Sequence, residues 1–180
     1  METDRFYLTL AMQEAEQAAQ ERTFPIGAVI VGPEGQIVGK GRNGVYRVGD
    51  YTAHAEIEAI RQAGSLLMAS EYRGKCTLYT TWEPCLMCTG ALIVAYIARV
   101  VWAANDEDGG ALHGRYEDLP TIQSRLALLS CTEAPEPDLA QRSDELIQQW
   151  IRMSDTYKAL WLKERHKKAR NGKFLLFMLF

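Results

Sequence analysis

Hydrophobic and polar positions alternate along the first hundred residues with the periods of helices and strands. Leu8, Met12 and Ala15 fall at helical spacing and predict an amphipathic helix over residues 6–19. The same kind of pattern predicts strands at 26–31, 36–42, 76–81 and 99–104, helices at 52–63 and 84–97, and a polar loop at 43–50. After residue 104 it predicts helices near 121–129 and 140–169 with a short strand between them.

The order of these elements predicts the class of the fold. Helices and strands alternate, which favours an α/β sheet covered by helices. A length of 180 residues fits about one domain. We therefore expect one domain over residues 1–150, followed at 151–180 by a basic helix and an apolar tail.

Composition excludes several classes of protein. The chain is 47% hydrophobic and 24% charged, as in ordinary globular proteins, so it is neither disordered nor collagen-like. Its longest apolar run, Phe174 to Phe180, is too short to cross a bilayer, and the charged N-terminus lacks the pattern of a secretory signal. Four unevenly spaced cysteines do not make a disulfide framework. We expect a cytoplasmic protein with no membrane partner.

Two short segments contain residues that suit a metal site. His54-Ala55-Glu56 and Pro84-Cys85-Leu86-Met87-Cys88 each stand at the predicted start of a helix. Cys85 and Cys88, three residues apart, share one helical face and can direct two sulfurs at one ion. One nitrogen from His54 and two thiolates leave the fourth position of a tetrahedral zinc open, which is typical of a catalytic site.

The open position predicts hydrolytic chemistry. Water bound there has a pKa of roughly 7, so hydroxide is present at neutral pH. Glu56 stands two residues from His54 and is placed to take a proton from that water and deliver it to a leaving nitrogen.

Together the two segments form the H-x-E…P-C-x-x-C signature of zinc nucleobase deaminases. The chain resembles the cytidine/deoxycytidylate-type deaminase superfamily over about residues 4–110, and in it the branch of tRNA adenosine, guanine and single-domain cytosine deaminases. The resemblance also rests on Pro25-Ile26-Gly27-Ala28. It implies a three-layer α-β-α sandwich with a mixed five-stranded sheet, commonly a homodimer formed through the zinc-site helices.

The resemblance also implies roles for individual residues. His54, Cys85 and Cys88 match the zinc ligands, and Glu56 matches the proton shuttle. Asn43 matches an asparagine whose amide reads the base in several members. Further candidates to line the base are Ile26, Ala55, Trp82 and His113. The implied enzyme is a hydrolase acting on C–N bonds of cyclic amidines, turning a ring C–NH₂ into C=O with release of ammonia.

Other interpretations of the same residues remain open at this point. A structural zinc would take a fourth ligand from Cys76, Cys131 or His113, and a redox C-x-x-C would need a metal-free thiol of low pKa. Neither accounts for Glu56. Asn43 precedes a glycine, which is also typical of a turn.

Charge bears on the size of the substrate. The net charge is −3, which excludes a uniformly basic coat, and residues 106–155 hold 11 acidic and 4 basic residues. The segment Lys158–Lys173 reverses this balance, with seven Lys or Arg and one Glu. It could be a solvated helix face or a phosphate-binding helix. The first hypothesis is therefore a free nucleobase or nucleoside; the alternatives are tRNA wobble adenosine and an inactive zinc-binding subunit.

Overall fold

A computed structural model describes residues 2–107, 109–112, 114, 116, 118–133 and 136–155. The helices are α1 (Glu2–Gln20), α2 (Val45–Val48), α3 (Ala55–Ala63), the 3₁₀ helix η1 (Gly64–Met68), α4 (Leu86–Val94), α5 (Pro120–Leu126) and α6 (Pro137–Met153). The strands are β1 (Gly27–Val31), β2 (Ile37–Arg42), β3 (Thr77–Trp82), β4 (Arg99–Ala104) and β5 (Ser130–Glu133).

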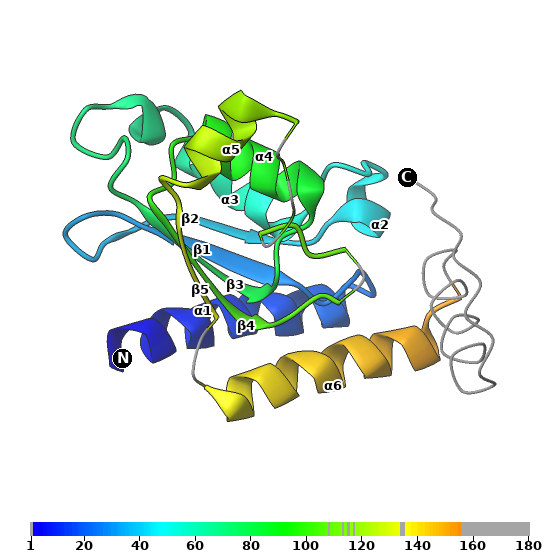
Figure 1. The fold of residues 1–180 in the computed structure, drawn as a ribbon. Helices are drawn as coiled ribbons and strands as arrows, with labels where there is room; N and C mark the ends of the chain where they lie inside the picture. Colours follow the sequence, from blue (N-terminus) through cyan, green and yellow to red (C-terminus); the bar gives the residue numbers. More distant parts are fainter. Residues whose placement is uncertain are drawn as a thin grey trace.

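The strands form one mixed five-stranded sheet in the order β2-β1-β3-β4-β5. β1 is antiparallel to both of its neighbours, whereas β3, β4 and β5 run parallel. Helices α1 and α6 lie on one face of the sheet, and α3, α4 and α5 lie on the other (Figure 1). The predicted α/β sandwich is confirmed.

The core consists of two apolar layers, one on each face of the sheet. Leu8, Ala11 and Met12 of α1 pack against Val29 and other inward side chains of the central strands. On the opposite face, α3 and α4 pack over the alternate positions of the same strands. All five residues of β1 are buried, as expected for a strand covered on both sides.

The N-terminal half of the chain follows the predicted elements closely. β4 occupies the predicted residues, and the other elements up to residue 104 begin or end within a few residues of their predicted limits. The loop predicted at 43–50 contains the short helix α2.

The C-terminal prediction needs correction. A single helix over 140–169 is wrong, because α6 begins at Pro137 and ends at Met153, where Ser154 is extended. Ser154 and Asp155 favour hydrogen bonds outside a helix, which explains a break there. The boundary predicted after residue 150 lies within α6. The basic segment Lys158–Lys173 and the tail 174–180 lie outside the described residues and stay predictions. No helix among the described residues is long and apolar enough to cross a membrane.

Candidate metal centre and active site

The first turns of α3 and α4 bring the predicted metal ligands together. His54 and Cys85 are the N-cap residues of α3 and α4, each with extended backbone, and neither side chain caps its own helix. Cys88 lies in the first turn of α4 and is buried. Within the described part of the chain, these three residues form the group that could hold a metal ion, with ligand atoms within 4.8 Å of one another.

The distances in this cluster fit zinc. Both sulfurs lie 3.6 Å from Nδ1 of His54. A tetrahedral zinc with ordinary Zn–N and Zn–S bonds separates nitrogen from sulfur by about 3.6 Å. One imidazole nitrogen and two sulfurs are also the donor set that zinc prefers. The residues present therefore fit the ion.

The two thiols have opposite pKa shifts. A hydrogen bond from Cys88, helped by His54, lowers the pKa of Cys85 to about 4. The hydrogen bond to Cys85 and burial raise the pKa of Cys88. These opposite shifts favour one thiolate beside one thiol, whereas zinc binding requires that both sulfurs be deprotonated.

Glu56 lies beside the cluster in the first turn of α3. Its side chain is buried, with the residue only 3% exposed. One carboxylate oxygen accepts from Thr80 Oγ1 at 3.4 Å and the other from Cys88 Sγ at 3.3 Å. Burial raises the pKa of Glu56, which favours a carboxyl group that can both hold and release a proton. The contact with Thr80, which comes from β3 of the sheet, could not be predicted from the sequence.

Asn43 follows β2 and is also buried. Its backbone N–H donates to the Ile26 carbonyl at 2.9 Å. Its Oδ1 accepts from Thr23 Oγ1 at 2.7 Å and from the Val45 N–H at 3.2 Å. The bond to Val45 is the turn interaction considered for this residue from sequence. Thr23 was not identified from the sequence.

Three of the remaining candidates lie in or against the core layer over which α3 packs. Ile26 and Ala55 are buried in the core layer over which α3 packs, and Trp82 packs against that layer half-buried. His113 lies outside the described residues. Cys76 is buried and donates to the Tyr72 carbonyl, and neither it nor Cys131 belongs to the metal group. Neither cysteine is therefore placed to act as a fourth metal ligand.

Glu83, two residues before Cys85, contacts the segment that follows β4. Its carboxylate accepts the backbone N–H groups of Asp106 and Leu112, both at 3.3 Å. The Ala111 N–H donates to the Pro84 carbonyl at 3.0 Å. Glu83 is buried, so it orders this segment beside Cys85 and is not a solvated charge at the strand end.

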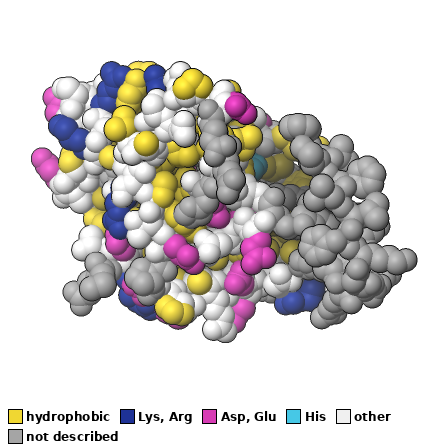
Figure 2. Space-filling view, viewed as in Figure 1, with side chains coloured by type: hydrophobic (Ala, Val, Ile, Leu, Met, Phe, Trp, Pro, Cys, Tyr) yellow, Lys and Arg dark blue, Asp and Glu magenta, His cyan; other side chains and the backbone are white. Residues whose placement is uncertain are grey.

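The face of the molecule shown in Figure 2 combines apolar and acidic surface. A histidine side chain is visible there beside hydrophobic side chains, and Asp and Glu side chains gather on the lower half of the face.

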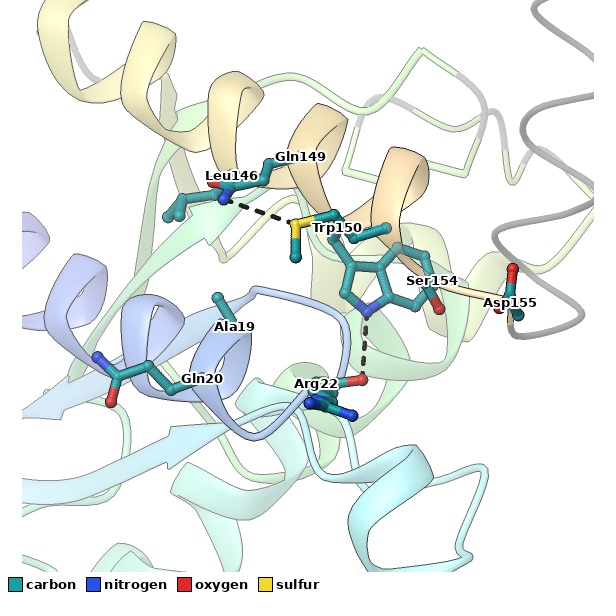
Figure 3. A pocket seen from close by; sticks show the side chains of 9 residues that line it. Ala19, Gln20, Arg22, Leu146, Gln149, Trp150, Ser154 and Asp155 are labelled. Atoms are coloured by element: carbon teal, nitrogen blue, oxygen red, sulfur yellow. Dashed lines mark hydrogen bonds between the residues drawn. The ribbon is translucent and has the colours of Figure 1, made fainter.

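A separate pocket of about 830 Å³ lies between the C-terminal ends of α1 and α6. In Figure 3, Trp150 donates to the Arg22 carbonyl beside this pocket, which none of the proposed metal ligands lines.

Comparisons with known proteins agree with this geometry. Residues 1–104 match the family model of the cytidine and deoxycytidylate deaminase zinc-binding region. The tRNA-specific adenosine deaminase of Aquifex aeolicus is 38% identical over 67% of this chain and 80% of its own length. That of Agrobacterium fabrum is 36% identical over 81% of this chain and 92% of its own.

Other similarities cover less of the compared proteins or come from solved structures. The tRNA(Ile)-lysidine synthase of Deinococcus radiodurans is 44% identical over 58% of this chain, which spans only 18% of that protein. A structure from studies of A-to-I editing by tRNA:A34 deaminases is 30% identical with a TM-score of 0.65, covering 79% of this chain and 99% of its own. The guanine deaminase of Bacillus subtilis is 40% identical with a TM-score of 0.52, and the match covers 58% of this chain and 66% of the guanine deaminase.

The family match spans the segments that contain His54, Glu56, Cys85 and Cys88, and the fold agrees with the solved relatives. The chain therefore belongs to the cytidine and deoxycytidylate deaminase family, and is a zinc-dependent hydrolase that acts on C–N bonds.

Proposed function

We propose that this protein deaminates adenosine in tRNA, replacing the C6 amino group by a carbonyl oxygen and releasing ammonia. The observation that carries this proposal is similarity to tRNA-specific adenosine deaminases over most of both chains, 36% identity across 151 residues in one case. The residue pattern alone favours a free base or nucleoside. Similarity to enzymes that act on tRNA makes adenosine in tRNA the preferred substrate over a free base or nucleoside.

We assign the metal to His54 Nδ1, Cys85 Sγ and Cys88 Sγ. The converging ligand atoms and their 3.6 Å separations support this assignment. Zinc held there lowers the pKa of a water molecule to about 7 and so supplies a nucleophile at neutral pH.

Glu56 is the proton carrier in this proposal. The carboxylate takes one proton as the water oxygen bonds to C6 and passes it to ring nitrogen N1. It then moves the remaining proton of that oxygen to the C6 amino group, so that the C6–N bond breaks, the C6 carbonyl forms and ammonia leaves. Its burial supports the role, because a carboxyl group sheltered from water takes up a proton more readily.

Asn43 holds the base through its side-chain amide, and Ile26, Ala55 and Trp82 provide apolar walls. Asn43, Ile26 and Ala55 are buried and Trp82 is half-buried, and Ala55 directly follows the proposed ligand His54, which supports this arrangement. His113, which lies outside the described residues, stays a candidate contact to the base.

We also propose a homodimer that meets through α4. Leu86 and Val94 of this helix are 63% and 69% exposed, and Met87 is exposed beside them. A helix with such a face is expected to pack against another apolar surface. A cytoplasmic location follows from the free thiols and the proposed tRNA substrate.

A free nucleobase such as guanine is the second candidate. It is favoured by the similarity to the Bacillus subtilis guanine deaminase and by the excess of acidic residues in 106–155, which does not suit a phosphate backbone.

A substrate panel tests the proposal. Ammonia release is measured with a tRNA anticodon stem-loop carrying adenosine at the wobble position, and with guanine, cytosine, adenine and their nucleosides. We expect release with the stem-loop. Release with guanine alone would support the second candidate, and no release from any substrate by the zinc-loaded protein would support an inactive zinc-binding subunit.

The variant Glu56→Ala is the control for this panel. It should bind zinc like the wild type and lose nearly all turnover, about 100-fold or more. Wild-type turnover by this variant would contradict the assigned role of Glu56.

A further inference from the structure

The loop between α1 and β1 places a hydroxyl group in the interior. Arg22 adopts the left-handed conformation with φ of 59°. Its N–H donates to the Ala19 carbonyl at 3.0 Å, and the Thr23 N–H donates to the Ala18 carbonyl at 3.1 Å. These bonds form a Schellman motif, in which the residue at the place of Thr23 usually makes an apolar contact with the helix. Thr23 is instead polar and fully buried.

The buried hydroxyl of Thr23 donates to Oδ1 of Asn43 at 2.7 Å. The backbone N–H of Val45 donates to the same oxygen at 3.2 Å. A carbonyl oxygen has two lone pairs, so these two donors use the full acceptor capacity of Oδ1. Because the Val45 N–H can only donate, rotation of the amide by half a turn would place two donors against each other.

The geometry points to Thr23 as a positioning residue for the reaction: its hydroxyl holds the Asn43 amide so that only N–H donors are offered to the substrate. Asn43 then recognises an acceptor atom of the base, a ring nitrogen or a carbonyl oxygen. This inference rests on the proposed function, since it takes Asn43 as a contact to the base.

The backbone around Asn43 is held independently of Thr23. The preceding residue, Arg42, pairs with Glu14 at 3.0 Å and Glu21 at 2.8 Å, and neither ion pair involves Thr23. The Asn43 N–H donates to the Ile26 carbonyl at 2.9 Å. Removing the Thr23 hydroxyl should therefore release the amide and leave the loop in place.

Thr23→Val and Thr23→Ser form the matched pair that tests the inference. Valine has the shape of threonine without the hydroxyl, whereas serine keeps the hydroxyl. We expect Thr23→Val to lower kcat/KM on the stem-loop by about 10-fold to 100-fold, and Thr23→Ser to stay within about 3-fold of the wild type. Zinc content and thermal midpoint should stay near the wild-type values in both variants.

A double-mutant cycle separates positioning from a general structural role. In an Asn43→Ala background, Thr23→Val should cause no further loss of kcat/KM, because its effect passes through the missing amide. An equal loss in both backgrounds, or equal losses for the valine and serine variants, would overturn the inference.

Side-chain amide NMR gives a readout that does not depend on the substrate. The chain has asparagine at 43, 105 and 171, and the signal absent from Asn43→Ala identifies the amide in question. It should shift in Thr23→Val and stay in place in Thr23→Ser. An unshifted signal in Thr23→Val would refute the positioning role. If ammonia is released only from guanine, the proposed tRNA substrate fails, and the same variants measured on guanine still decide the role of Thr23.

Discussion

At the scale of single residues, the site depends on two N-cap side chains that do not make the usual capping hydrogen bond to their own helix. His54 and Cys85 occupy N-cap positions without capping their helices, so their side chains are available to a shared ligand. The sequence predicts this cluster because its residue types and spacings are specific to zinc. Thr23 and Thr80 could not be predicted, because their contacts join residues far apart in the chain and common in any core.

Metal content distinguishes the assigned ligands from the other cysteines. Cys85→Ser should lose most bound zinc together with activity, since a serine hydroxyl is a weak replacement for a thiolate. Cys131→Ser, outside the cluster, is the matched control and should keep both. Zinc measured by atomic emission after dialysis checks this, and full occupancy in Cys85→Ser would refute its assignment as a ligand.

Asp4 should make folding stability depend on pH in acid. Its carboxylate accepts from Arg99 at 2.8 and 2.9 Å and from Tyr79 at 2.8 Å. The hydrogen bond from Arg99 lowers the pKa of Asp4 below its usual 3.8. This contribution is therefore fully present above about pH 4 and is lost as the pH falls through the lower pKa of the folded state.

Asp4→Asn should accordingly lower the free energy of unfolding by about 1–3 kcal/mol at pH 7, with the difference shrinking in acid below the usual pKa. Denaturant titrations at several pH values measure it. Glu71→Gln, at an exposed carboxyl, is the control and should change the free energy little. A constant loss for Asp4→Asn at every pH would show that its charge is not the cause.

At the scale of elements, close packing of α3 on β2 sets the position of the segment that carries His54 and Glu56. A Cβ atom added at Gly41 would overlap the backbone of Ala55 and Ala59 in α3. Gly39 and Gly41 belong to a pattern that matches G-x-G-x-x-G. In a dinucleotide-binding motif these glycines open a long helix, and the residues that follow here do not form one. The structure shows what these glycines do: they let α3 approach the strand.

Gly41→Ala should lower the free energy of unfolding by at least about 2 kcal/mol and reduce activity, because α3 must move and carries Glu56 with it. Gly90→Ala in α4 is the control for packing within one chain, since a Cβ there meets no atom of the same chain within 4 Å. It should leave the free energy unchanged or raise it by up to about 1 kcal/mol. Thermal denaturation with parallel ammonia assays compares the two, and similar behaviour would contradict the packing argument.

Most elements of the first 104 residues were predictable, because buried strands and amphipathic helices leave clear periodic patterns. The elements after residue 104 were harder to predict. α5 contains no buried residue, and β5 is only partly buried. Elements with so little buried surface show only weak apolar alternation, yet α5 and β5 lie where a helix near 121–129 and a short strand after it were expected. The end of α6 depends on Ser154 and Asp155, whose weak helix propensity is a small signal next to a long amphipathic stretch.

At the scale of the whole molecule, the exposed side of α4 places a proposed subunit contact beside the metal centre. Leu86 directly follows Cys85, and Met87 directly precedes Cys88. A second copy packed on this helix would shield the first turn of α4 from water. Quaternary structure and metal retention should therefore be linked.

Val94→Glu should shift the protein from dimer to monomer, because it places a charge in an apolar contact two turns from the ligands. Sedimentation velocity measures the change. Lys75→Glu, at an exposed position outside α4, is the control and should leave the dimer intact. A wild-type chain that sediments as a monomer, or an unchanged dimer in Val94→Glu, would refute the proposed interface.

The packing of Trp150 from α6 against the loop between α1 and β1 has a consequence for biosynthesis. Its ring meets Phe24 edge to face at 4.7 Å, and its N–H donates to the Arg22 carbonyl, immediately before Thr23. Residues 54–88, which supply the metal ligands, are translated long before residue 150, and chains fold from the N-terminus as they are made. We therefore expect the nascent chain to become able to bind zinc before the loop that holds Asn43 gains this support from α6.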